Sequence, residues 1–188
     1  MTRRLILLGC ATLALGLAGL VRAAELPAPA LLPLPAQLKI GAGTFTVDAR
    51  TPIVLADDAA ATRRTGAYLA DLIARTRGLR LPLKHGAVST HAIVLQLDPA
   101  AVTNREGYAL DVTPAGMRIS ARDAAGLFYG AVTAWQLLTP DAQHGAVQVP
   151  ALSIRDQPRF AWRGLMLDSV RHFQTVDEIE RLLEQMAQ

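Results

Sequence analysis

Apolar and polar residues alternate in several short stretches of the chain, with the period of half-buried β-strands. Residues 108–112 and 117–121 flank Thr113-Pro114-Ala115-Gly116, whose proline and glycine stand where a β-turn favours them, so we expect a hairpin there. Gly41-Ala42-Gly43 predicts a second hairpin, over residues 38–47. Further short strands are expected at residues 53–55 and 93–97 and, as a last hairpin at the sheet edge, at residues 147–149.

Two stretches have the helical period instead. The first runs from Asp57-Asp58 to Arg77-Gly78, and we interpret the adjacent aspartates as helix caps rather than a catalytic carboxylate pair. The second follows Asp123 and ends before Pro140, and its Gly126 and Gly130 form a flat strip for close packing against a sheet. Residues 37–150 thus predict an α+β domain, a mixed or largely antiparallel sheet with two helices on one face. No nucleophile and base are paired in it, which favours a supporting role.

The most informative stretch is RFAWRGLMLDSVRHF, residues 159–173. Gly164 to Leu167 is apolar at successive positions, as in a strand buried on both faces. Asp168, Arg171 and His172 follow directly, and Thr175-Val176-Asp177-Glu178 then starts a helix with a capping box. A strand, a polar tip and a helix form the opening unit of a parallel (β/α)₈ (TIM) barrel, in which the carboxyl ends of the strands carry the chemistry. Because only one such unit is present, we expect a truncated barrel.

The N-terminus predicts export. Arg3 and Arg4 precede an apolar run from Leu5 to Val21, and Ala23 and Ala24 are small residues suited to cleavage, so residues 1–24 are interpreted as a signal peptide. An uncleaved anchor is the alternative, although the run is shorter than the roughly 20 residues of a membrane span. Residues 25–36 are rich in proline and alanine and are expected to be extended. We expect a periplasmic or extracellular protein.

Charge and cysteine content exclude several classes. The chain has 19 Lys and Arg against 16 Asp and Glu, but three of the arginines lie in residues 1–24, so the mature chain has 16 of each sign. Neither nucleic acid nor an anionic membrane surface has an electrostatic reason to bind it. Cys10, the only cysteine, lies in the signal region, which excludes disulfides and a thiol nucleophile from the mature chain. No metal or other cofactor is expected.

Two motifs together resemble a known family. GYALDVTPAGMRISARDAAGLFYGAVTAWQLL, residues 107–138, and IRDQPRFAWRGLMLDSVRHF, residues 154–173, are similar to the N-terminal portion of glycoside hydrolase family 20, the β-N-acetylhexosaminidases. The resemblance implies a non-catalytic domain over residues 25–153 and the start of a catalytic barrel at residue 154. It also implies removal of terminal N-acetylglucosamine or N-acetylgalactosamine with retention of stereochemistry, in which the acetamido oxygen of the substrate attacks the anomeric carbon. The family's catalytic Asp–Glu pair would follow Gln188, so we assign no catalytic residue here.

One residue matches a binding residue of that family. Arg171 corresponds to the arginine that hydrogen-bonds hydroxyls of the terminal sugar, and a guanidinium suits that task because its rigid fork donates to two adjacent acceptors. From spacing alone, a purely structural ion pair between Arg171 and Asp168 is equally open. Asp168 and His172 are interpreted as supporting residues, with Asp168 orienting the arginine. Arg163, at the start of the strand, is interpreted as structural.

Two alternatives remain open at this point. α-Glucuronidases and O-GlcNAc hydrolases pair a similar first domain with a barrel, so the substrate class could differ. The chain could also be a complete secreted binding module without enzymatic activity. Against the module, one strand and one helix cannot bury Gly164 to Leu167, so we expect residues 163–188 to expose an apolar surface and the chain alone to be inactive.

Overall fold

A seven-stranded mixed sheet forms the centre of the protein, in a computed structural model that describes residues 29–87 and 90–188. The strand order is β1-β7-β5-β6-β4-β2-β3. Strands β1, β7, β5 and β6 pair antiparallel, whereas β6, β4, β2 and β3 pair parallel. The strands are β1 (Gln37–Val47), β2 (Ile53–Leu55), β3 (Leu83–His85), β4 (Ile93–Leu97), β5 (Tyr108–Thr113), β6 (Gly116–Ala121) and β7 (Val147–Asp156).

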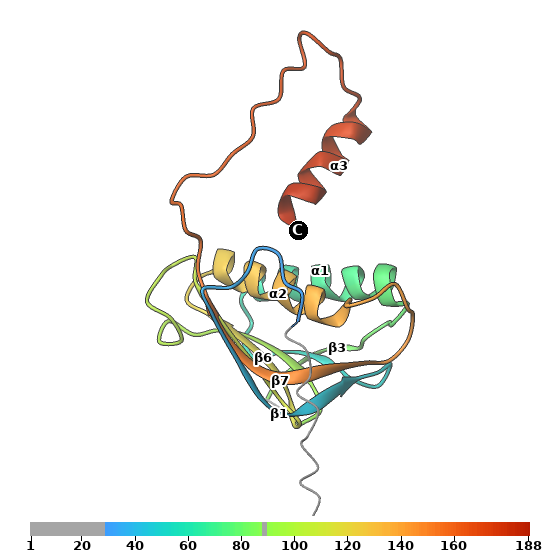
Figure 1. Cartoon of the computed structure of the whole chain (residues 1–188), viewed down its shortest axis with the longest axis vertical. Helices are drawn as coiled ribbons and strands as arrows, with labels where there is room; N and C mark the ends of the chain where they lie inside the picture. The colour runs from blue at the N-terminus through green and yellow to red at the C-terminus, as the bar shows by residue number, and fades with distance from the viewer. Residues whose placement is uncertain (1–28, 88–89) are drawn as a thin grey trace, which may run out of the picture.

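Helices α1 (Ala60–Arg77) and α2 (Ala124–Leu138) lie side by side over one face of this sheet (Figure 1). The α+β arrangement expected from the sequence is therefore confirmed, as is the β5–β6 hairpin. The predicted signal peptide lies outside the described residues. Across the described ranges, no helix is both long and apolar enough to cross a membrane.

The core lies between the sheet and the two helices. Alternate strand residues such as Ile53, Ile93 and Leu95 point to the helix side and pack with Leu69 and Ile73 of α1. The residues between them in sequence face the other way and form a small separate cluster of Val54, Ala92 and Val94. The period-2 pattern thus decides which residues lie beneath the helices.

The predicted hairpin over residues 38–47 is wrong. Residues 37–47 form one strand, β1, which pairs along its length with β7 and shifts register between Ile40 and Thr44. The glycines therefore belong to a bulge, not a turn, and Gly43 has a φ of 92° that favours glycine there. Pro150 lies opposite Thr44 at this register shift, and proline within a sheet is tolerated at such bulges.

The predicted sheet edge at residues 147–149 is also wrong. These residues begin β7, a ten-residue strand that continues to Asp156 and lies between β1 and β5. The short strand β3 was not predicted from the sequence. It pairs parallel with β2, because helix α1 carries the chain back to the same edge.

Asp57 and Asp58 do not cap α1 in the expected way. The N-cap residue is Ala59, without a side-chain capping bond. Asp57 instead accepts hydrogen bonds from the N–H of Ala59 at 2.9 Å and of Leu97 at 2.8 Å. Burial raises the pKa of Asp57, but these hydrogen bonds outweigh it and hold the pKa below its ordinary value. This carboxylate therefore ties the start of α1 to the end of β4.

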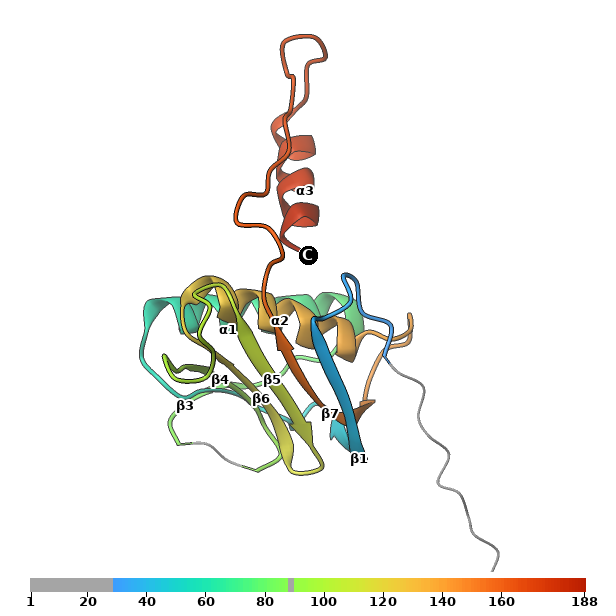
Figure 2. The same cartoon turned by 60° about the vertical axis from the view of Figure 1, so that its left-hand side comes forward.

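Residues 157–188 leave the sheet on the helix side and return through helix α3 (Val176–Ala187), which comes back toward α1 and α2 (Figure 2). The predicted capping box of α3 is confirmed, with Thr175 and Glu178 bonded reciprocally. The predicted strand over Gly164–Leu167 is wrong for this chain, because these residues are extended but have no neighbouring strand. The structure therefore contains the helix of the expected βα unit without its strand.

Gly126 and Gly130 provide the close approach of α2 that the sequence indicated. A Cβ atom on Gly126 would lie 2.1 Å from the backbone oxygen of Gly107, which is far inside van der Waals contact. A Cβ atom on Gly130 would lie 2.6 Å from the Ile119 side chain and 3.1 Å from the ring of Tyr108. The first half of α2 thus packs directly on the backbone that precedes β5.

We predict that Gly126→Ala lowers the free energy of unfolding by about 3 kcal/mol, because its methyl group meets backbone that cannot move aside. Gly130→Ala is the matched comparison and should cost about 1 kcal/mol, since side chains can shift and alanine favours a helix. Urea unfolding followed by circular dichroism measures both. Equal losses, or no loss at Gly126, would contradict this packing.

Candidate functional site

The predicted site residues lie in a turn that follows the extended residues Gly164–Leu167. Asp168 Oδ1 accepts hydrogen bonds from the backbone N–H of Val170 and of Arg171, both at 3.2 Å. Asp168 Oδ2 lies 3.3 Å from Arg171 Nε. One carboxylate therefore shapes the turn and also holds the side chain of the arginine.

The guanidinium of Arg171 remains open to a ligand. Its side chain is 83% exposed, and Asp168 contacts Nε, the guanidinium nitrogen nearest to the main chain. The two terminal nitrogens, Nη1 and Nη2, make no hydrogen bond to the described part of the chain. This is the geometry in which an arginine can donate to two neighbouring hydroxyl groups.

His172 is not brought into this arrangement. It is exposed, and no hydrogen bond joins it to Asp168, Arg171 or another residue in the described ranges. In these same ranges, no group of three or more His, Cys, Asp or Glu side chains is placed to hold a metal ion.

The chain around the turn exposes large apolar side chains. Trp162 is 85% exposed, Met166 88% and Val170 96%. Phe160, Leu165 and Phe173 are exposed as well, and so is Val176 at the start of α3. Single exposed apolar residues are ordinary, but a continuous run marks a surface that another structure covers. The expected apolar surface of residues 163–188 is therefore confirmed.

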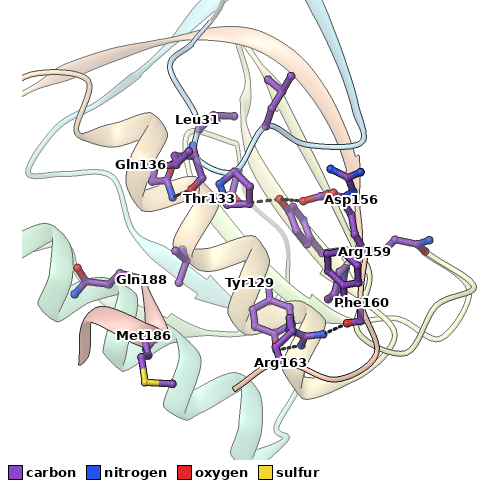
Figure 3. Close-up of a pocket in the computed structure, with 18 residues that line it drawn as sticks. Leu31, Tyr129, Thr133, Gln136, Asp156, Arg159, Phe160, Arg163, Met186 and Gln188 are labelled. Atoms are coloured by element: carbon purple, nitrogen blue, oxygen red, sulfur yellow. Dashed lines mark hydrogen bonds between the residues drawn. The ribbon is translucent and has the colours of Figure 1, made fainter. Parts of the chain in front are cut away.

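A cavity of about 440 Å³ lies where this stretch leaves the first domain (Figure 3). Its walls are residues 31–34, the outer side of α2, residues 156–160 with Arg163, and the end of α3. Asp168, Arg171 and His172 do not line it. The cavity is therefore a junction between segments rather than the site predicted from the sequence.

Hydrogen bonds at this junction fasten the N-terminal segment to α2 and β7. Gln136 bonds the backbone of Leu32 twice, by its Oε1 and its Nε2, each at 2.9 Å. Asp156 Oδ1 accepts from Ala36 N–H at 3.0 Å, and its Oδ2 accepts from the Tyr108 hydroxyl at 3.3 Å. Burial raises the pKa of Tyr108 far above its ordinary value, so the phenol stays protonated as a donor.

A second cluster at the junction was missed by sequence reasoning. Arg163 contacts Glu106, which precedes β5. It also contacts Tyr129 of α2 (Figure 3). Arg163 lies 57 residues from Glu106 and 34 residues from Tyr129 in the sequence, and no local motif predicts these contacts. Two aromatic residues of α2 serve in packing: Phe128 lies against the ring of Tyr68, and Trp135 packs against the core.

Comparison with known protein families identifies both parts of the chain. The model of glycosyl hydrolase family 20, domain 2, matches residues 28–157. The model of the glycosyl hydrolase family 20 catalytic domain matches residues 160–188. The turn with Asp168 and Arg171 therefore lies in the part that matches a catalytic domain.

Individual relatives agree. A beta-hexosaminidase of Porphyromonas gingivalis is 34% identical over 163 residues, which cover 84% of this chain and 21% of that protein. A beta-N-acetylhexosaminidase of Cellulomonas fimi is 33% identical, with 86% of this chain and 33% of that protein covered. The chain thus spans a fifth to a third of the length of these relatives.

Solved structures show the same fold. The Streptomyces plicatus N-acetyl-beta-hexosaminidase in complex with Thio-NAglucal has a TM-score of 0.67 and 40% identity, with 80% of this chain and 30% of that chain covered. The exo beta-N-acetylglucosaminidase from Vibrio harveyi in complex with N-acetylglucosamine has a TM-score of 0.71 and 26% identity, with 83% and 23% covered.

The backbone of Gly164–Leu167 makes no hydrogen bond within the described residues, so we predict that its amides exchange with solvent within about tenfold of the unstructured rate. Amides of β4, buried in the sheet, should exchange at least about a thousandfold more slowly. Hydrogen–deuterium exchange of the purified monomer measures both. Strong protection of residues 164–167 would instead support a self-sufficient binding module.

Proposed function

The chain belongs to glycosyl hydrolase family 20, and on this basis we propose that it is the N-terminal part of an exported β-N-acetylhexosaminidase. The enzyme would remove terminal N-acetylglucosamine or N-acetylgalactosamine from oligosaccharides or glycoconjugates. In this proposal residues 25–153 form a supporting domain and residues from 154 on open the catalytic barrel. Residues 1–24 would direct export to the periplasm or the extracellular space.

One observation carries the proposal for the site. Arg171 presents an open guanidinium, steadied by Asp168, within the stretch that matches the family's catalytic domain. The turn also follows directly on Gly164–Leu167, whose apolar pattern is that of a central barrel strand. Pairing of that strand would place Arg171 at its carboxyl end, where barrel enzymes bind their substrates.

Each residue of the turn then has a defined task. Arg171 donates to two hydroxyls of the terminal sugar, which fixes the orientation of the ring. Asp168 fixes the orientation of the guanidinium before the sugar arrives, so less freedom is lost on binding. Bond cleavage, with attack by the acetamido oxygen of the substrate and retention of stereochemistry, would depend on an Asp–Glu pair carried by later barrel strands.

The two alternatives are less well supported. The relatives named above are hexosaminidases, which favours an N-acetylhexosamine over a glucuronic acid substrate. A self-sufficient binding module would bury its apolar residues, whereas Trp162, Met166 and Val170 are largely exposed.

We expect the purified 188-residue chain to show no hydrolysis of a chromogenic N-acetyl-β-glucosaminide above the rate of the blank. The reason is that Asp168 is the only carboxylate bonded to Arg171 in the described residues, whereas the Asp–Glu pair proposed for bond cleavage would lie on later barrel strands. A colorimetric assay at high protein concentration tests this. Measurable turnover, abolished by Arg171→Gln, would show that these residues form a complete site.

In a chain continued through the catalytic domain, Arg171→Gln should lower kcat/KM by roughly 10²–10³-fold, because two charge-assisted hydrogen bonds to the sugar are lost. Arg159→Gln is the matched control, since this exposed arginine lies outside the turn. Steady-state kinetics on aryl N-acetylglucosaminides and N-acetylgalactosaminides make the comparison. An unchanged kcat/KM for Arg171→Gln would refute the assigned role.

A further inference from the structure

Arg163 makes the densest set of contacts between residues 157–175 and the first domain. Its Nη2 lies 3.0 Å from Glu106 Oε1 and 3.0 Å from the Tyr129 hydroxyl, and its Nη1 lies 3.4 Å from Glu106 Oε2. The guanidinium also lies 5.8 Å from the centre of the Tyr129 ring. Nη1 also donates a hydrogen bond to the backbone oxygen of Phe160, three residues earlier in the chain. Both terminal nitrogens of the Arg163 guanidinium therefore donate hydrogen bonds.

The two partners of Arg163 are themselves held firmly. The N–H of Glu106 donates to Asn104 Oδ1 at 2.8 Å, and the N–H of Gly107 donates to the Asn104 backbone oxygen at 3.1 Å. Gly126 presses α2 onto the backbone of Gly107, and Tyr129 follows one helical turn later. Glu106 and Tyr129 therefore lie at the same corner of the first domain, where α2 packs on the backbone that precedes β5.

We propose that Arg163, Glu106 and Tyr129 form a clamp through which the non-catalytic domain positions the sugar-binding turn. The clamp grips the chain immediately before Gly164–Leu167, so it fixes where this stretch begins and in which direction it runs. Arg163 is a positioning residue, five residues from Asp168 and eight from Arg171. The inference rests on the proposed function only where it takes Arg171 to bind the sugar.

The clamp depends on the charge of Glu106. The hydrogen bond from Arg163 lowers the pKa of Glu106, against a smaller opposing effect of burial. The groups that face Glu106 are Arg163 and the Tyr129 hydroxyl, whereas the neighbouring Arg105 is paired with Asp123 at 2.7 Å. A lowered pKa means that the ion pair is intact at neutral pH and is lost as the pH falls through that pKa.

A distance measurement between two spin labels tests the clamp without any sugar. One label is placed on β7 by Gln148→Cys and the other beyond the clamp by Met166→Cys; both positions are exposed. Cys10→Ser removes the natural cysteine wherever residues 1–24 are retained. Double electron–electron resonance then gives the width of the distance distribution.

We expect a narrow distribution at neutral pH that becomes at least twofold broader in Arg163→Gln and in Glu106→Gln. The two changes together should broaden it no further, because each breaks the same clamp. Lowering the pH should broaden the distribution of the parent protein but not that of Glu106→Gln. Arg159→Gln, four residues away and exposed, is the matched control and should leave the width unchanged.

A charge exchange separates positioning from general destabilisation. Glu106→Arg combined with Arg163→Glu should narrow the distance distribution again, since the ion pair is restored with its signs reversed. Circular dichroism should give the same melting temperature for the parent protein and for all these variants. A parent distribution as broad as that of Arg163→Gln would overturn the clamp. No sugar is involved in this test, so a negative result would not contradict the proposed role of Arg171. Equally, unchanged kinetics of Arg171→Gln would not contradict the clamp.

Discussion

The unpaired backbone of Gly164–Leu167 is the constraint on which the remaining features depend. Its residues are apolar at successive positions, so a sheet must bury both of its faces, and its N–H and C=O groups require partners on both edges. The described residues supply neither. Asp168 and Arg171 follow this stretch directly, so the proposed position of Arg171 at a bound sugar depends on the strands that would pair with it.

The first domain contributes the other fixed point. Strand β7 delivers the chain to Asp156, where Tyr108 and the backbone of Ala36 hold the carboxylate. The N-terminal segment and the outgoing chain are thus fastened at the same corner of the sheet, beside α2 (Figure 3). Within the described residues, the first domain thus fixes the point at which residues 157–188 leave the sheet.

Residues that lie close together in the sequence made part of the fold predictable. The β5–β6 hairpin is encoded by Pro114 and Gly116 in the turn, and the start of α3 is encoded by Thr175 and Glu178, all within a few residues. Gly126 also indicated close packing of α2 correctly, although its partner, the backbone of Gly107, became known only from the structure.

Long-range pairing accounts for what the sequence did not disclose. Gly41 and Gly43 are as suited to a turn as to a bulge, and only the presence of β7 beside β1 decides between the two. Asp57 is bound by the N–H of Leu97, 40 residues away. In the same way, Arg163 could be interpreted as structural from its position, but its partners Glu106 and Tyr129 follow from the packing of α2 on the sheet.

The most direct measurement is a crystal structure of the chain continued through its catalytic domain, with N-acetylglucosamine bound. We expect Gly164–Leu167 to form a strand paired in parallel on both edges, with the Arg171 guanidinium within hydrogen-bond distance of two sugar hydroxyls. An unpaired Gly164–Leu167, or an Arg171 turned away from a bound sugar, would contradict this expectation.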